Sequence, residues 1–401
     1  MYQQAFLNHP DTSNVSILVK RNPRMSLIRS TLLTLISLIL ALSIAGYLYQ
    51  AIGTYQDKKN YPAPGQLIPV DGHKMHIIQK GKGLPSVILD AGTGSFSAMW
   101  FTVTDETAKF SSVYAYDRAG QGWSEESPLP RTAVNMVHEL HTLLTNANVP
   151  KPYIMVGHSL GGGIGQLYAN TYPDDVFGLV LVDAGHADTT KKIAEHHLAF
   201  KRCMTGFTMI DTTEKNHQPY EPFLQRAFLR LTNSHLGEKI AEITGLQRLY
   251  LSSFYAQTGK AQYEVTPAML ARLLAPSTFR TTSQEIAHYG DSGSQLAGLE
   301  NHLANKPLIV IGNGRGFFYN HLCHTHMTLP EIEFNNEVWF PLQKDLATKS
   351  TNSKLIIAQE SGHRIQDTEP ELVINAIKEL VDLYRSAFTD EGANSAFNNL
   401  R

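Results

Sequence analysis

Short apolar runs recur along the chain between turn-forming residues. Two of them, at 67–70 and 75–79, flank Asp71-Gly72, a dipeptide typical of a β-hairpin turn. Six more follow at 86–91, 112–117, 153–157, 178–184, 307–312 and 354–358. Most of these later runs are continuously apolar, which is typical of strands covered on both faces. The pattern predicts eight strands.

Helical patterns lie between the later runs. In 132–147, Val137, Leu140 and Leu144 follow the three-and-four spacing of an amphipathic helix. Strands that alternate with helices predict an α/β fold, a mostly parallel sheet with helices on both faces.

The stretch 187–300 interrupts this rhythm. It contains amphipathic stretches such as 236–256 and 266–275, and no clear strand. We predict a helical cap inserted over the edge of the sheet. Its aromatic residues, most of which are expected to pack between cap and sheet, are Phe200, Phe207, Phe223, Phe228, Tyr250, Phe254 and Tyr255.

The N-terminal part contains an uncharged stretch from Ser30 to Gln56. A membrane-spanning helix needs about 20 apolar residues, so this stretch is long enough. Because Lys20, Arg21, Arg24 and Arg29 precede it, the positive-inside rule places the N-terminus in the cytoplasm and the rest of the chain across the membrane. The alternatives are a signal peptide cleaved after Ser43-Ile44-Ala45 and a buried core helix.

Composition and charge narrow the classes of protein. The chain has 401 residues, of which 42% are hydrophobic and 2 are cysteine, which excludes a disordered chain and a disulfide scaffold. Residues 1–60 hold six Lys or Arg and two Asp, so the 28 basic and 34 acidic residues after them carry a net charge of −6. An acidic body without a basic stripe argues against a nucleic-acid partner. The pairing of Cys203 with Cys323 stays open.

A candidate nucleophile follows the run at 153–156. The sequence continues Gly157-His158-Ser159-Leu160-Gly161 into a helical pattern at 164–172. Strand, G-x-S-x-G and helix in this order hold a serine on a sharp turn beside a helix N-terminus, which favours developing negative charge. Glycines beside the serine let strand and helix approach. Ser159 is therefore predicted to be the nucleophile, and His158 to be a lining residue.

These residues resemble the α/β-hydrolase fold over about residues 65–385. The stretch from Tyr116 to Ser124 also resembles the D-x-x-G-x-G-x-S turn after the fourth strand of that fold, where Asp117 and Arg118 are expected to build the turn. The resemblance implies a mostly parallel eight-stranded sheet with a helical cap, here preceded by one transmembrane helix.

The base and the acid of a catalytic triad are predicted from the same resemblance. His363 follows the last apolar run and precedes the helical pattern at 369–385, as the family's histidine does. Most members carry the acid after the seventh strand, but residues 312–316 contain no carboxylate. Relatives resembling haloalkane dehalogenases carry it after the sixth strand, where this chain has Asp183. Asp183 is our prediction, and the weaker candidates are Asp188, Glu360 and Asp367.

Two N–H groups are predicted to form the oxyanion hole. One belongs to Leu160, the residue after the nucleophile, and the resemblance assigns the other to Thr93 in the loop after the third strand. No cofactor is implied. The cluster from His321 to His326 offers four metal-ligand side chains, but we interpret it as a polar loop and not as a metal site.

These predictions combine into a serine hydrolase that is anchored in a membrane and acts on a small or lipid-like acyl substrate. The dehalogenase and epoxide-hydrolase reactions are disfavoured because those members use Asp as nucleophile. Two alternatives stay open: a non-catalytic binding protein of the same fold, and a cofactor-free haloperoxidase or C–C hydrolase using the same triad. The predicted parts are a cytoplasmic segment 1–29, an anchor 30–52, a linker 53–66, a core 67–186 and 301–388, a cap 187–300 and a tail 389–401.

Overall fold

The predicted strands form one sheet of eight. The computed structural model describes residues 23–195, 240–241, 244–246, 248–252, 266–299, 303–316 and 329–398. The strand order is β1-β2-β4-β3-β5-β6-β7-β8; β2 is antiparallel to β1 and β4, and the remaining pairings are parallel. The strands are β1 (Gln66–Val70), β2 (His73–Lys80), β3 (Ser86–Asp90), β4 (Val113–Tyr116), β5 (Tyr153–His158), β6 (Val176–Val182), β7 (Leu308–Asn313) and β8 (Ser353–Ala358). The predicted mostly parallel α/β fold is confirmed.

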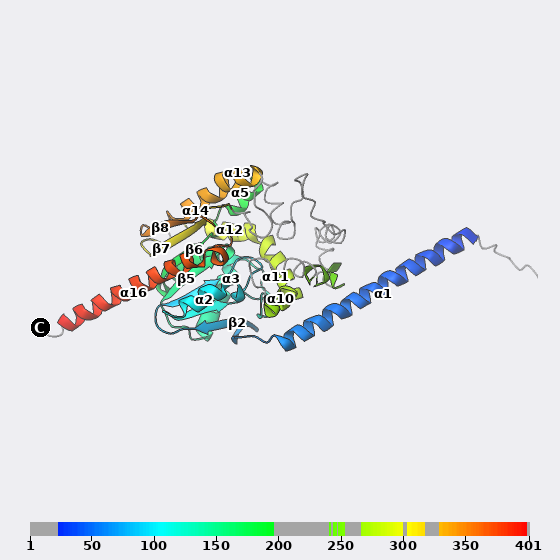
Figure 1. Ribbon diagram of the computed structural model, residues 1–401, viewed down its shortest axis with the longest axis horizontal. Helices are drawn as coiled ribbons and strands as arrows, with labels where there is room; N and C mark the ends of the chain where they lie inside the picture. The colour runs from blue at the N-terminus through cyan, green and yellow to red at the C-terminus, as the bar shows by residue number, and fades with distance from the viewer. Residues whose placement is uncertain are drawn as a thin grey trace, which may run out of the picture.

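Helices cover both faces of this sheet (Figure 1). Alternate residues of a strand point to opposite faces, so Met155 of β5 packs with α3 and α4, whereas Ile154 packs with α2 and α16. The covering helices are α2 (Phe101–Thr107), α3 (Ala133–Asn146), α4 (Leu160–Thr171) and α16 (Pro370–Asn398). Smaller elements of the body are η1 (Ser97–Trp100), η2 (Pro173–Asp175), α13 (Leu329–Phe334), η3 (Asn335–Trp339), α14 (Phe340–Leu346) and α15 (Ile365–Thr368).

The stretch predicted as a cap contributes only helices among its described elements. They are α5 (Thr189–Glu195), α10 (Pro267–Leu273), α11 (Pro276–Ala287) and α12 (Tyr289–Ala297), and we call them, with the described residues 240–252, the cap. Proline begins both α10 and α11, a position where its missing N–H costs nothing. Of the aromatic residues predicted here, Phe200, Phe207, Phe223, Phe228, Phe254 and Tyr255 lie outside the described residues.

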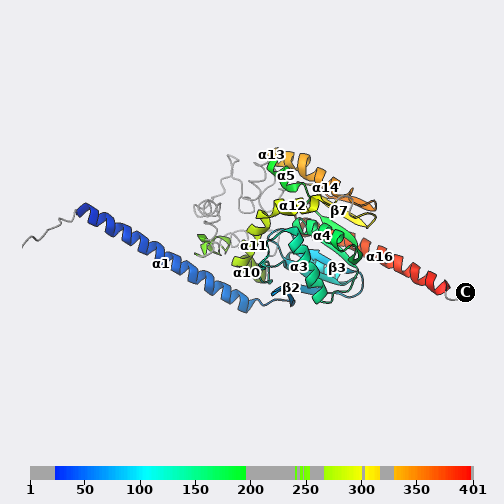
Figure 2. The ribbon, with the colours of Figure 1, turned by 180° about the vertical axis from the view of Figure 1, so that it is seen from behind.

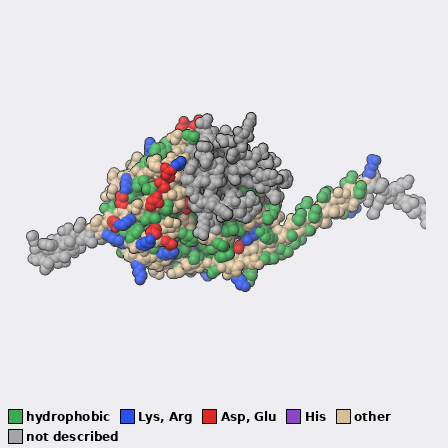
Figure 3. Space-filling view, viewed as in Figure 1, with side chains coloured by type: hydrophobic (Ala, Val, Ile, Leu, Met, Phe, Trp, Pro, Cys, Tyr) green, Lys and Arg blue, Asp and Glu red, His purple; other side chains and the backbone are tan. Residues whose placement is uncertain are grey.

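The N-terminal helix α1 runs from Pro23 to Asn60 and extends from the body as a long arm (Figures 1 and 2). An 18-residue window within its segment Leu27–Asn60 has a mean hydropathy of 2.2, so the helix is long and apolar enough to cross a membrane. Hydrophobic side chains follow this arm, whereas the visible face of the body mixes both charges with apolar groups (Figure 3).

Two predicted boundaries differ from the structure. The linker 53–66 is helical up to Asn60, because Lys58 and Lys59 suit the negative end of a helix and the chain reaches proline only at Pro62. The tail 389–401 is likewise part of α16 as far as Asn398, since 386–398 contains no proline to end the helix.

The C-terminal half of α1, which lies nearest the body, packs against the cap. The Gln50 side-chain amide lies 3.4 Å from the carbonyl oxygen of Leu274, and Asp57 forms an ion pair with Arg248. At Gly46 the approach is so close that a Cβ would lie 1.9 Å from the carbonyl oxygen of Thr244. The helix is therefore joined to the folded body through the cap.

Candidate active site

Ser159 is the single residue between β5 and α4. Its φ of 53° and ψ of −119° lie outside the regions that residues with a Cβ prefer. Backbone hydrogen bonds hold this conformation: its N–H donates to Val182 O at 3.2 Å, and its carbonyl accepts from Gly162 N at 3.0 Å and Gly185 N at 2.7 Å. The predicted sharp turn is present, and the half-buried Ser159 lies at the carboxyl end of the sheet.

Glycine is required on both sides of this turn because backbones meet there. A Cβ on Gly157 would lie 2.3 Å from the carbonyl oxygen of Gly161, and a Cβ on Gly161 would lie 2.4 Å from that of Asp90. Contacts this short do not occur in proteins, so any side chain would push β5, α4 or the loop after β3 out of place. The glycines thus bring the serine and that loop together.

The structure joins His363 and Asp183, which are distant in sequence. His363 lies in the loop between β8 and α15, and its Nδ1 is 2.6 Å from Oδ2 of Asp183, the first residue after β6. Asp183 is fully buried, whereas the His363 side chain is 14% exposed. The aspartate is thus placed to select the histidine tautomer that carries its proton on Nδ1.

Two residues that the sequence did not reveal complete the surroundings of Asp183. Asn313, the last residue of β7, donates its backbone N–H at 3.1 Å to Oδ1, and its side-chain amide at 3.0 and 2.9 Å to Oδ1 and Oδ2. The indole N–H of Trp339 donates at 2.9 Å to Oδ1. The only feature of the sequence that pointed to Asn313 was its position at the end of the seventh strand, where the expected carboxylate was missing. No feature of the sequence pointed to Trp339.

His158 lies against His363, with ring centroids 4.5 Å apart. Its Nε2 donates to the carbonyl oxygen of His363 at 2.8 Å, so it fixes the backbone of that loop. Burial, with the neighbouring His363, lowers the pKa of His158 well below its ordinary value. A neutral His158 that donates from Nε2 agrees with the predicted lining role.

The loop after β3 lies against the nucleophile. A Cβ on Gly92 would be 2.8 Å from Nδ1 of His158 and 3.2 Å from the Cβ of Ser159. The next residue, Thr93, hydrogen-bonds through its hydroxyl to the Tyr289 hydroxyl of α12. Leu160 is the first residue of α4, where an N–H has no acceptor within the helix. The two residues predicted to donate to the oxyanion therefore belong to the loop after β3 and to the start of α4, both of which lie next to Ser159.

Asp117 and Arg118 have different roles. Asp117 builds the turn after β4, as predicted, because its carboxylate accepts from the N–H of Ser97 at 2.7 Å and of Trp123 at 2.9 Å. Arg118 instead points to the loop after β3 and binds its carbonyl groups and Asp90. The backbone of Arg118 contributes to the turn as expected, because its carbonyl accepts from the N–H of Gln121 at 2.9 Å, and its guanidinium in addition reaches another loop and the cap.

The remaining candidates lie elsewhere. The carboxylates of Glu360 and Asp367 pair with Arg315 and Arg364, and Oδ2 of Asp188 lies 4.0 Å from Nδ1 of His186. Cys203, Cys323 and the cluster 321–326 fall outside the described residues. Within the described part of the chain, no three His, Cys, Asp or Glu side chains are grouped as metal ligands would be.

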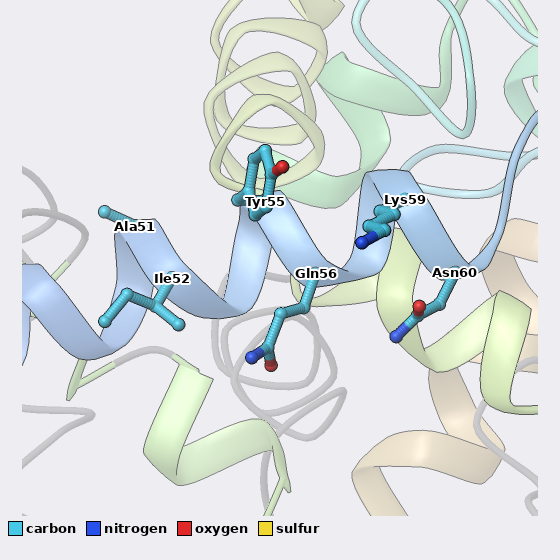
Figure 4. A pocket seen from close by; sticks show the side chains of 6 residues that line it. All are labelled: Ala51, Ile52, Tyr55, Gln56, Lys59 and Asn60. Atoms are coloured by element: carbon cyan, nitrogen blue, oxygen red, sulfur yellow. The ribbon is translucent and has the colours of Figure 1, made fainter.

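A separate hollow of about 780 Å³ lies along α1 (Figure 4). It is lined by Ala51, Ile52, Tyr55, Gln56, Lys59 and Asn60. All six belong to the last turns of α1, and none belongs to the elements that carry Ser159, Asp183 or His363. The hollow is therefore distinct from the candidate active site.

Comparisons with known proteins agree with this fold. A model of the alpha/beta hydrolase family matches residues 87–376. The uncharacterized protein YqjL of Bacillus subtilis is 36% identical over 311 residues, which cover 77% of this chain and 88% of YqjL. Among solved structures, an epoxide hydrolase of Bacillus megaterium aligns with a TM-score of 0.52 at 17% identity, over 79% of this chain and 100% of its own. A serine hydrolase involved in carbazole degradation aligns with a TM-score of 0.50 at 17% identity, over 79% and 98%. At these identities the structural likeness shows the fold alone.

Proposed function

The chain belongs to the alpha/beta hydrolase family, and on that premise we propose that it is a serine hydrolase that cleaves a carboxylic ester or related acyl bond. Ser159 is the nucleophile, His363 the general base and Asp183 the residue that orients it; Leu160 and Thr93 donate to the oxyanion. The observation that carries the proposal is the 2.6 Å contact between His363 and buried Asp183, beside a serine held in a strained turn.

The reaction follows from these positions. With its Nδ1 proton directed to Asp183, His363 carries its lone pair on Nε2, which takes the hydroxyl proton as Ser159 Oγ attacks the acyl carbon. The carbonyl electrons move to the oxygen, where the two N–H groups stabilise the charge. The intermediate collapses, and the leaving alcohol receives the proton from His363. Water then attacks the acyl-enzyme by the same proton route and releases the acid.

The identity of the nucleophile separates this reaction from that of the epoxide hydrolase with a similar fold. The family resemblance implies an aspartate in epoxide hydrolases, whereas residue 159 is serine. A serine forms an acyl-enzyme, so esters, thioesters and amides are its natural substrates. The missing carboxylate after β7 favoured a non-catalytic protein, but the contact of Asp183 with His363 supports a complete triad.

We also propose that α1 anchors the protein in a membrane with its N-terminus in the cytoplasm. Gly46, Gln50 and Asp57 lie against the cap, so the part of α1 left for the bilayer precedes them. Residues 27–45 provide about 28 Å of helix at about 1.5 Å per residue, close to the thickness of a hydrocarbon core. The basic residues Lys20, Arg21 and Arg24 before it, with Arg29 in its first turn, support a cytoplasmic N-terminus.

Labelling with a fluorophosphonate tests the proposed function. The full-length protein in detergent is expected to react covalently and to hydrolyse p-nitrophenyl butyrate, whereas Ser159→Ala does neither. Asp183→Asn is expected to lower kcat by about 10⁴-fold, because the amide selects the wrong histidine tautomer. Equal absence of labelling in the wild type and Ser159→Ala would contradict the proposal.

A further inference from the structure

The guanidinium of Arg118 is buried and reaches three groups of the loop after β3. Its Nη1 donates to Asp90 Oδ1 at 2.6 Å and to Ala91 O at 2.5 Å, and its Nη2 donates to Gly92 O at 2.7 Å. The side chain is 2% exposed. All three acceptors are therefore held by one guanidinium group that is buried away from solvent.

The cap supplies the other partner of Arg118. Glu285 of α11 is 1% exposed, and its Oε1 accepts from Arg118 Nε at 2.9 Å. Its Oε2 accepts from the backbone N–H of Gly94 at 3.1 Å. Burial alone lowers the pKa of the guanidinium, but the carboxylates of Glu285 and Asp90 outweigh it and raise that pKa, so Arg118 stays charged.

These contacts determine the direction of one N–H group. The Gly92 carbonyl and the Thr93 N–H belong to the same peptide group, which is planar and trans, so they point in opposite directions. By holding Gly92 O, Arg118 orients the Thr93 N–H. Glu285 meanwhile occupies the N–H of Gly94, and the Gly92 carbonyl also accepts from the N–H of Ser95 at 3.1 Å, so the two N–H groups that follow Thr93 are already engaged.

We propose that Glu285 and Arg118 form a clamp through which helix α11 of the cap positions the Thr93 N–H in the oxyanion hole. Glu285 is thus a positioning residue, supplied by the cap, for a hole otherwise built from the core. The hydrogen bond between the hydroxyls of Thr93 and Tyr289 adds a second attachment from α12. This inference rests on the proposed function, because it concerns the donor assigned to Thr93.

The test compares p-nitrophenyl acetate with its thiono analogue, whose sulfur accepts hydrogen bonds poorly. Removal of one oxyanion donor costs about 10²- to 10³-fold in kcat, and misplacing one costs less. Glu285→Ala is expected to lower kcat for the oxoester by about 10- to 100-fold with little change in KM, and kcat for the thionoester much less. The ratio of the two kcat/KM values therefore falls. Glu285→Gln, which keeps an acceptor of the same shape, is expected to lie between this variant and the wild type.

A second ion pair between α11 and the core provides the control. Arg280 and Glu126 pair at 2.6 Å on the surface, away from the loop after β3. Glu126→Gln is expected to leave both rates and their ratio unchanged. Should Glu285→Ala fail to fold, the ratio is measured on Glu285→Gln, whose folding is checked by its thermal transition.

The outcomes separate the two proposals. An active wild type with an unchanged oxo-to-thiono ratio in the Glu285 variants, whether or not their rates fall, would overturn the clamp and leave the serine hydrolase intact. A wild type that neither hydrolyses the ester nor reacts with a fluorophosphonate would overturn the proposed function, and this inference with it.

Discussion

The buried carboxylate of Asp183 accepts hydrogen bonds from the uncharged N–H groups of Asn313 and Trp339, in addition to His363. A buried carboxylate is costly unless its oxygens have such partners. Because these two partners carry no charge, an imidazolium formed on His363 in the reaction that we propose meets no competing cation among them. The neutral donors hold the carboxylate in place and leave its attraction for the imidazolium undiminished.

The contact between Asp183 and Asn313 predicts that the acid can be moved between neighbouring strands. Asp183→Asn is expected to lose about 10⁴-fold in kcat. In the double variant Asp183→Asn with Asn313→Asp, the carboxylate lies at the end of β7, where most of the family carries it. The kcat of this double variant is expected to be about tenfold or more above that of Asp183→Asn. Steady-state hydrolysis of p-nitrophenyl butyrate measures both. A double variant no faster than Asp183→Asn would show that only residue 183 reaches His363 productively.

His158 gives the stability of the protein a pH dependence. Its pKa is lowered by burial in the folded protein, whereas in the unfolded chain a histidine titrates near about 6.5. Below that pH the unfolded chain binds a proton that the folded chain does not, so the free energy of unfolding falls as the pH is lowered. His158→Gln keeps an N–H for the His363 carbonyl but does not titrate.

We therefore expect the wild type to lose about 1 kcal/mol more than His158→Gln between pH 7 and pH 5.5. Denaturant unfolding of both proteins in detergent at the two pH values measures the difference. Parallel losses in the two proteins would mean that His158 takes up its proton in the folded state, against the lowered pKa.

The sequence pointed to the proposed nucleophile, base and acid because each follows a recognisable strand. Ser159 and Asp183 directly follow β5 and β6, and His363 lies in the loop after β8; parallel strands bring their carboxyl ends to one edge of the sheet. Glu285 could not be found in this way. It lies within a helix of the cap, and only the folded structure places it beside Arg118, 167 positions away in the sequence.

At the scale of elements, strands were easier to predict than helix ends. The eight apolar runs were bounded by turn residues, which mark where a strand must stop. The end of α1 was missed because Asp57 to Asn60 is polar, and polarity does not end a helix; the chain continues to Asn60 and stops before Pro62. A change from apolar to polar residues therefore shows where the helix becomes exposed to water, and does not show where the helix ends.

The contact between α1 and the cap depends on the absence of a side chain at Gly46. A Cβ there would lie 1.9 Å from the Thr244 carbonyl, so Gly46→Leu must separate the two elements. Overpacking of this kind costs about 1–3 kcal/mol. The thermal transition of the detergent-solubilised protein is expected to fall by a few degrees (about 2–4 °C per kcal/mol). Ala51→Leu, an exposed position on the same helix, is the control and is expected to leave the transition unchanged. Equal transitions in the two variants would mean that α1 and the cap are not packed together.

At the scale of the whole molecule, charge is distributed unevenly about α1. Six Lys or Arg and two Asp lie within residues 1–60, and the body after them carries a net charge of −6. Four of the six basic residues precede the uncharged stretch 30–56 of α1, and Lys58 and Lys59 follow it beside Asp57. Positive residues within about 15–20 positions of a span determine its orientation, whereas acidic residues contribute little. In the orientation that we propose, the bias of four against two is the term that directs the body across the membrane.

Removal of those four charges is expected to reverse or mix the orientation. With Lys20, Arg21, Arg24 and Arg29 all replaced by Gln, only the two lysines after the helix remain near the span, so the rule now retains that end in the cytoplasm. Protease added outside intact cells is expected to digest the catalytic body of the wild type and to spare much of the variant. Exchanging Lys and Arg for each other at the same four positions keeps the charge, and is expected to keep the wild-type pattern. Digestion of the Gln variant as complete as that of the wild type would show that the folded body, and not the flanking charge, determines the orientation.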